Sequence, residues 1–463
     1  MSISRRQFVV GCSTAIGAMA GGRLGQLVFA AEPQAGTTSS AYLPLMGRAR
    51  ADEIFVMVFL RGGCDSLSMI SPYDDPIYVT KRGGNPLNNG NSLVLKDPIT
   101  INPNNAAFGA TSSFGLHPKA APLKELYDAG KLAIVHAAGL DDDTRSHFDA
   151  MDFIERGTPG NKNTATGWLT RHIEIVGESQ GLLPTISTGS AAPSSLLSYN
   201  EAVVMSDLNS YGISAPYSYN NSGNPAMLKT LTSLYQGQGA FVDAGKRALE
   251  VINGIQTLKA QNGNHDLAYT PEAGITYPNG GLAGSLKLLA QIVKLNLGLR
   301  IATVDFGGWD THDNQGTNGG YYANQVDTLA RSLLAFYNDL PNHRDRVTVV
   351  VQSEFGRRLG KNGGNGTDHG HGGAMFVLGG TVNGGKIYGS WPGLQDLDQK
   401  QDLKTTTDYR AVLGEIVTKR LGNPKLGHVF PKLAPNVSGD TQLGYKSLGI
   451  IPGDDVAIDF TTP

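Results

Sequence analysis

Carboxylates and imidazoles occur at four places in this sequence, each beside an unbroken apolar run. In chain order they are Asp65, Asp310 with His312, Glu354, and His369 with His371. Oxygen and nitrogen ligands of this kind suit a divalent ion, zinc first, with manganese or calcium as alternatives. Neighbouring glycines let the backbone wrap closely around such an ion. Because glycine-flanked histidines have little use in packing, we interpret the 310–312 and 368–371 clusters as metal-binding or catalytic.

The segment DDDTRSHFDAMD, residues 141–152, leads from an apolar run into an expected helix. A hydroxyl at such a position ordinarily caps the helix, and we expect that role for Thr144. A helix N-terminus also favours an anion, so a hydroxyl there could attack a phosphoryl or sulfuryl centre. Ser146 is our first candidate for this nucleophile and Thr144 the second.

Charged neighbours complete the candidate site. Arg145 or Arg357 could bind substrate oxygens bidentately. His147 could act as an acid or base, or as a metal ligand. Other candidates also have a structural interpretation: Asp65 taken alone would more commonly cap a helix, and His117, which precedes a proline, is expected in a loop or cap. His136 lies within an apolar run, which predicts a core histidine.

Apolar runs that lack polar alternation and end in glycine are typical of strands buried on both faces of a parallel sheet. They occupy residues 53–60, 131–139, 183–189, 299–308, 346–356 and 374–380. Helical patterns fall between them, at 118–130 and 326–340. This alternation predicts an α/β fold with a mainly parallel central sheet flanked by helices. Ligands of such folds bind beyond the carboxyl ends of the strands, where the candidate residues lie.

The chain divides into unequal parts. Residues 1–31 contain SRRQFV at positions 4–9, the pattern of a twin-arginine export signal, and 32–50 read as a linker. We expect one domain at 51–435, with a cap inserted at about 190–280 that is helical at 226–235 and 240–259, and a C-terminal tail at 436–463. The mature protein should be periplasmic or secreted, and no later segment is apolar enough to span a membrane.

The net charge and the cysteine count limit the binding partners and the covalent bonds that we expect. The formal net charge of the whole sequence is −2, and removal of the signal makes it more acidic, so we expect no nucleic-acid partner. Signal cleavage leaves Cys64 as the single cysteine, which excludes an intrachain disulfide. A twin-arginine substrate crosses the membrane folded, often after loading its metal in the cytoplasm, and does not need oxidative folding. Oligomeric state is not encoded in any recognisable pattern.

The phrases FLRGGCDSLS, RSHFDAMD, GGWDTHDNQ, SEFGRR and TDHGHGGAMFVLGG resemble the DUF1501 family over about residues 50–425. More loosely, the order of parts resembles the alkaline phosphatase and sulfatase superfamily. That resemblance implies an alkaline phosphatase-like fold, a nucleophile in the turn at 144–146, and metal ligands at the four places named first. Glu354-Phe355 stands where the superfamily has Asp-His. This departure leaves open whether the site holds one ion or two.

Together these patterns favour an exported metal-dependent hydrolase of phosphate or sulfate esters, acting on a small molecule or a glycan. Asp65, Asp310, His312, Glu354, His369 and His371 would hold the ion or ions. One alternative is a non-catalytic exported binding or assembly protein that keeps the scaffold. Another is a metal-free serine esterase that uses Ser146, which the lack of a Gly-x-Ser-x-Gly elbow disfavours.

Overall fold

The structure is a computed structural model that describes residues 52–83, 92–177, 179–214, 224–436, 443–454 and 456–462. The predicted export signal (1–31) and linker (32–50) lie outside these residues. No helix in the described ranges is both long and apolar enough to cross a membrane.

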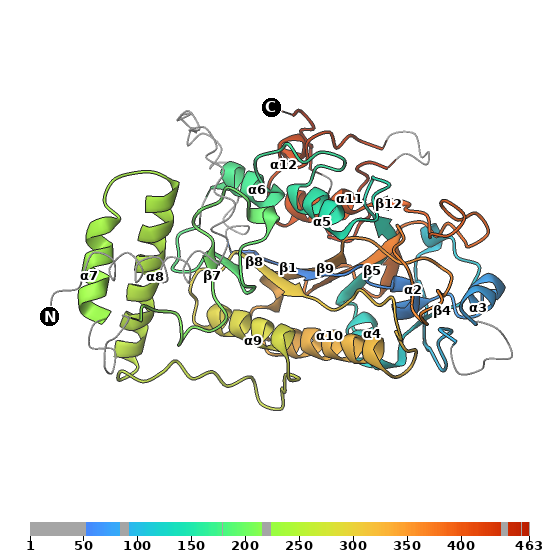
Figure 1. Ribbon diagram of the computed structural model, residues 1–463, viewed down its shortest axis with the longest axis horizontal. Coiled ribbons are helices and arrows are strands. Elements are labelled where there is room, and N and C mark those ends of the chain that lie inside the picture. Colours follow the sequence, from blue (N-terminus) through green and yellow to red (C-terminus); the bar gives the residue numbers. More distant parts are fainter. Residues whose placement is uncertain are drawn as a thin grey trace.

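A mixed, mainly parallel sheet forms the centre of the molecule (Figure 1). Across the sheet the strands are β11 (Lys386–Tyr388), β5 (Leu132–Gly139), β10 (Gly373–Gly379), β9 (Val347–Ser353), β1 (Ile54–Leu60), β8 (Ile301–Phe306), β6 (Thr185–Ser187) and β7 (Val203–Val204). A short strand, β12 (Thr407–Asp408), pairs with β5. All six predicted apolar runs are confirmed as strands of this sheet. Every residue of β1 is buried, as expected for a strand covered on both faces.

Helices cover both faces of the sheet (Figure 1). One face packs on α4 (Ala121–Asp128), α9 (Gly281–Lys294) and α10 (Tyr321–Asn338), and the other on α5 (His147–Arg156), α6 (Trp168–Val176), α11 (Tyr409–Lys419) and α12 (Leu426–Val429). Alternate residues of β1 supply the two cores: Val56 and Val58 belong to the first, Phe55 and Met57 to the second. The predicted α/β class is therefore confirmed.

Several small elements have no signal in the sequence pattern. A second sheet contains β2 (Ile70–Ser71), β4 (Phe114–Leu116) and β3 (Ile99–Ile101), and beside it lie α2 (Ser66–Met69) and α3 (Pro76–Gly83). Strands of two or three residues are too short to display a hydrophobic period. The helix predicted at 118–130 is a 3₁₀ turn, Pro118–Ala120, followed by α4.

The region predicted as a cap contains two of the expected helices, α7 (Asn224–Leu234) and α8 (Ala240–Gln261). They lie side by side at the β7 end of the sheet (Figure 1). A small hydrophobic cluster of their own, with Leu231, Tyr235 and Leu249 at its centre, holds them together. α8 also contributes Val251 and Ile255 to the first main core, so the helix pair is anchored to the rest of the fold.

The direction of β10 decides which residues meet. β1 is parallel to both β8 and β9, so these three strands end at one edge of the sheet. β10 is antiparallel to β9 and to β5, and therefore begins at that same edge. Residues that precede β10 consequently lie beside residues that follow β8 and β9, although they are distant in sequence.

We predict that Phe55→Ala destabilises the protein by about 3–5 kcal/mol, because the ring is fully buried and its loss leaves a cavity. The ring packs edge-on against Trp168, with centroids 5.6 Å apart. Phe241→Ala is the matched control, since Phe241 is 53% exposed, and should change stability by less than about 0.5 kcal/mol. Urea unfolding measures both; equal effects would contradict this packing.

Candidate metal centre

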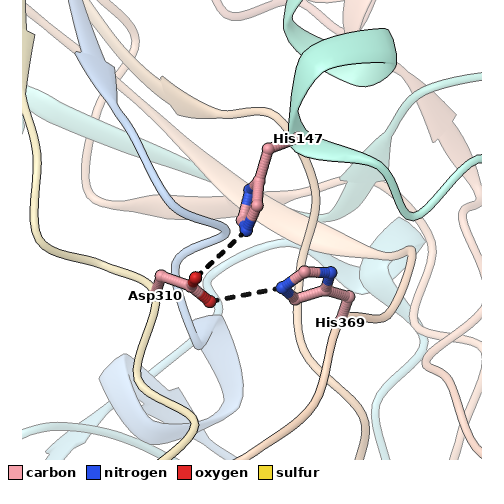
Figure 2. Close-up of side chains that lie close together, drawn as sticks. All are labelled: His147, Asp310 and His369. Atoms are coloured by element: carbon pink, nitrogen blue, oxygen red, sulfur yellow. Dashed lines mark hydrogen bonds and ion pairs between the residues drawn. The ribbon is translucent and has the colours of Figure 1, made fainter.

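Three side chains from distant segments converge where β8 and β9 end (Figure 2). His147 opens α5, Asp310 follows β8, and His369 precedes β10. One nitrogen or oxygen from each lies within 4.8 Å of the others. Asp310 is central: its Oδ2 lies 3.3 Å from His147 Nε2 and its Oδ1 lies 3.2 Å from His369 Nε2. His312 lies beside this group, with Nε2 3.0 Å from Asp310 Oδ1 and 2.8 Å from His369 Nε2, although it is not one of the three residues whose ligand atoms all lie within 4.8 Å of one another.

All three imidazoles are held in the same way at their other nitrogen. His147 Nδ1 lies 2.8 Å from Glu354 Oε1, and His312 Nδ1 lies 3.0 Å from Asp368 Oδ1. His369 Nδ1 lies 2.8 Å from the backbone carbonyl of Arg145. Carboxylates and carbonyls can only accept, so each Nδ1 carries the proton. In a neutral ring Nε2 then presents its lone pair to Asp310, the usual arrangement of a metal-binding histidine.

The spacing of these atoms suits a bound cation. Without a proton or cation between them, two imidazole lone pairs 2.8 Å apart, beside a carboxylate, repel each other. His147 Nε2 is buried and makes no hydrogen bond within the described part of the chain. In a tetrahedral zinc site with bonds near 2.0–2.1 Å, ligand atoms lie about 3.3 Å apart. The observed separations of 2.8 to 3.3 Å approach that value.

Arg357 fixes the position of Asp310. Its side chain is buried, and Nη2 donates to Asp310 Oδ1 at 2.5 Å. Burial raises the pKa of Asp310, but the hydrogen bond and charge of Arg357 outweigh that and lower the pKa to about 2. The other guanidinium nitrogens donate to the backbone carbonyls of Gly63 at 2.6 Å and Thr367 at 2.7 Å. Arg357 therefore holds Asp310 ionised and leaves no nitrogen unengaged for a substrate.

Glu354 lies behind His147. The carboxylate is fully buried; Oε1 also accepts from the backbone N–H of Gly62 at 2.8 Å, and Oε2 accepts from Ser353 Oγ at 2.9 Å. Burial raises the pKa of Glu354, but the hydrogen bonds from His147 and the backbone lower it overall. The hydrogen bond to Glu354 in turn raises the pKa of His147. Since both its oxygens already have protein partners, we assign Glu354 to orienting His147, in place of the ligand role predicted from sequence.

Residues 133–413, more than half of the chain, match the family described as "Protein of unknown function (DUF1501)". The chain belongs to the DUF1501 family. No curated protein matches the sequence. The matched range of this DUF1501 protein contains His147, Asp310, His312 and His369, whereas Asp65 precedes it.

The structure places Asp65 outside the group, in a buried ion pair. Arg82 Nη1 lies 2.6 Å from Asp65 Oδ2, and Arg82 Nη2 lies 2.8 Å from Oδ1. Both residues are fully buried. Asp65 does occupy the N-cap position of α2, but its side chain makes no capping hydrogen bond. A buried carboxylate needs a paired charge, and Arg82 supplies it, so we do not assign Asp65 as a ligand.

His371 belongs to a second group, with Asp143 and Asp398. Its Nδ1 lies 2.5 Å from Asp398 Oδ2 and 3.5 Å from Asp402 Oδ2. Arg145 Nε donates to Asp402 at 2.9 Å. The sequence predicts that His369 and His371 belong to one site. In the structure, these acidic partners hold His371 in a group of its own. Arg145 already offsets part of the negative charge of those partners.

The segment before α5 supplies its cap and one backbone contact. Ser146 is the N-cap, and its Oγ accepts from the Asp149 N–H at 3.4 Å. Thr144, predicted as the cap, instead accepts from the Ser146 N–H at 3.2 Å. The side chain of Arg145 pairs with Asp402, while its carbonyl orients His369. The described contacts thus engage the side chains of both Arg145 and Arg357 within the protein. Neither side chain is directed towards a substrate by these contacts.

The structural interpretations of two other histidines are confirmed. His117 caps the turn at Pro118–Ala120 by accepting from the Lys119 N–H at 3.0 Å. His136 is fully buried, and its Nε2 lies 3.1 Å from the Ile70 carbonyl. Asp368 lies in the 368–371 cluster predicted from sequence, but its contact with His312 is not predicted; its place directly before His369 is the available signal.

We predict that Glu354→Gln lowers the pKa of His147 in the metal-free protein, because a neutral amide replaces the carboxylate that favours the protonated ring. The folded pKa of His147 is raised above its unfolded value of about 6.5. Protonated His147 therefore stabilises the metal-free fold below that pH, and the contribution disappears as pH rises through the folded pKa. NMR titration of the ring measures the shift.

The control for this titration is Glu174→Gln, which removes a carboxylate 3.3 Å from His428, outside the group. It should leave the His147 titration unchanged. An unaltered His147 pKa in Glu354→Gln would show that the pair does not orient the ring.

Proposed function

We propose that this DUF1501 protein is a metal-dependent hydrolase that holds one divalent ion between His147, Asp310, His312 and His369. The observation that carries the proposal is the convergence of three Nε2 atoms on one carboxylate, with every Nδ1 held by an acceptor. Three imidazoles and one carboxylate favour zinc over calcium, which prefers oxygen ligands alone. Manganese is the alternative ion.

A divalent ion bound there would lower the pKa of a coordinated water and stabilise developing negative charge. The protein's own residues prepare that chemistry. Arg357 keeps Asp310 ionised, and Glu354 and Asp368 keep two rings in the Nδ1–H tautomer. The ligands are thus fixed before an ion arrives, which reduces the reorganisation that binding and reaction require.

One ion is sufficient for this proposal. The second group, around His371, pairs an imidazole with Asp398, and the buried Asp402 beside it already has Arg145 as a partner. Arg358 adds a further positive charge 3.9 Å from Asp402. Since these cations are part of the chain, the group does not require a metal to balance it.

A phosphate or sulfate ester, on a small molecule or a glycan, is the substrate class we propose. Support comes from α5, a ten-residue helix whose N-terminus lies at the metal group. Among the hydrogen bonds of the described residues, none engages the backbone N–H of His147 or Phe148. Unpaired N–H groups at a helix start favour anionic oxygens.

Ser146 is the nucleophile we prefer for such a reaction. Its Oγ lies at the start of α5 and accepts one long hydrogen bond, from the Asp149 N–H. Thr144 is less suitable because its hydroxyl supports the Ser146 backbone. A nucleophile at a helix start, on a mixed sheet covered by helices, is also consistent with the alkaline phosphatase and sulfatase superfamily. We propose that fold relationship together with the activity.

The export pathway is part of the same proposal. Arg5 and Arg6 lie in a twin-arginine pattern, and we propose a periplasmic or secreted location for the folded protein. Transport in the folded state would allow the ion to be loaded beforehand.

A non-catalytic metal-binding scaffold is the second candidate, and one observation favours it. Arg357 is engaged entirely within the protein, and Arg145 pairs with Asp402, so neither is presented to a substrate by the described contacts. Enzymes that bind phosphate or sulfate commonly use an arginine fork for this purpose. A metal-free serine esterase is less well supported, because the hydrogen bonds of Ser146 in the described structure include no imidazole.

We predict that the purified protein binds about one equivalent of zinc and hydrolyses an aryl phosphate or aryl sulfate. Asp310→Ala and His369→Ala should each reduce zinc affinity and hydrolysis by more than about 100-fold, since changes merely behind a ligand cost 10–100-fold. His265→Ala is the control, because this histidine is exposed on the surface. Elemental analysis and an ester panel provide the readouts.

The outcomes separate the two candidates. Zinc binding without turnover on either ester class would support the scaffold and contradict the hydrolase. Wild-type protein that binds no zinc, or variants that keep full affinity, would contradict the metal centre itself.

A further inference from the structure

A buried glutamine lies directly beneath the two loops that carry most of the proposed ligands. Gln315 is fully buried and uses all four hydrogen-bonding positions of its amide. Its Oε1 accepts from Thr311 Oγ1 at 2.9 Å and from Thr367 Oγ1 at 2.9 Å. Its Nε2 donates to Asp65 Oδ2 at 2.7 Å and to Ser68 Oγ at 3.1 Å.

The two threonines are adjacent to ligands in the chain. Thr311 lies between Asp310 and His312, and Thr367 lies two residues before His369. The backbone joins the same loops, because the Thr367 N–H donates to the Thr311 carbonyl at 3.1 Å and the Gln315 N–H to the Asn365 carbonyl at 3.1 Å. A single amide oxygen thus connects the loop of two ligands to the loop of a third.

The orientation of that amide is determined by a fixed charge. The carboxylate of Asp65 can only accept, so Nε2 must face it and Oε1 must face the threonines. Asp65 is itself immobilised by Arg82, whose Nε donates to the Leu359 carbonyl at 2.8 Å. Asp65, which the sequence suggested as a ligand, therefore anchors Gln315 at the base of the site.

We propose that Gln315 is a positioning residue that sets the distance between the loops at 310–312 and 367–369, and thereby the zinc affinity of the centre. This inference rests on the proposed function, because it presupposes that these residues bind zinc. Removal of the amide leaves the backbone hydrogen bonds intact but frees both threonine side chains. The ligands then lose the geometry in which three Nε2 atoms and Asp310 can share an ion, while each ligand remains present.

The test compares two glutamine-to-methionine changes of the full-length protein. Gln315→Met keeps the length of the side chain and removes the amide; we expect a 10- to 100-fold weaker zinc affinity. Gln291→Met is the matched control, because Gln291 is also buried and its Nε2 donates to the Leu267 carbonyl at 2.7 Å, on α9 away from the centre. Competition with a zinc-chelating dye measures affinity, and thermal unfolding of the metal-free proteins measures stability.

A second pair of variants keeps the test decisive if Gln315→Met does not fold. Thr311→Ser retains the hydroxyl that reaches Gln315 and should keep wild-type affinity. Thr311→Val has the same shape as threonine without the hydroxyl and should lose affinity as Gln315→Met does. Rescue by serine distinguishes the hydrogen bond from simple packing.

Each result has a separate meaning. If wild-type protein binds zinc and Gln315→Met or Thr311→Val binds it equally well, the positioning role is wrong while the proposed function stands. The same conclusion follows if Gln291→Met weakens zinc binding as much as Gln315→Met. If wild-type protein binds no zinc, the proposed function fails first, and the inference with it.

Discussion

Three imidazole rings point their Nε2 atoms at one carboxylate, and each ring is fixed by an acceptor at Nδ1. When the rings are neutral, the nitrogen lone pairs of neighbouring rings face each other. They are closest at the 2.8 Å contact between His312 Nε2 and His369 Nε2. A cation bound among them would convert that repulsion into coordination. The ion pair of Arg357 with Asp310 and the burial of Glu354 behind His147 both serve this requirement.

The side chains that meet at this site come from segments that are far apart in the chain. β8 and β9 end, β10 begins and α5 starts at one edge of the sheet, and each contributes a proposed ligand or a residue that orients one. The antiparallel direction of β10 is essential, because a parallel strand would carry His369 to the opposite edge. Beneath this edge, Gln315 and the Asp65–Arg82 pair form a fully buried polar layer. Such a layer is stable only when its hydrogen bonds are satisfied, which also makes it rigid.

The sequence predicted the strands well, because glycine-bounded apolar runs indicate burial on both faces. It also singled out Asp310, His312, His369 and His147 as candidate site residues, and the structure brings these four side chains together. It could not distinguish the proposed ligands from supporting residues, because pairings such as Asp65 with Arg82, or Glu354 with His147, depend on the tertiary fold and not on spacing. The separation of His371 from His369 has the same origin, in acidic partners contributed by another loop.

The most direct test of the account is X-ray absorption spectroscopy of the wild-type protein loaded with one equivalent of zinc. The account predicts a four-coordinate ion with three imidazole nitrogens and one oxygen, at bond lengths of about 2.0–2.1 Å. An ion surrounded by oxygen ligands alone, or one with a single imidazole, would contradict the convergence of His147, His312 and His369 on a shared metal.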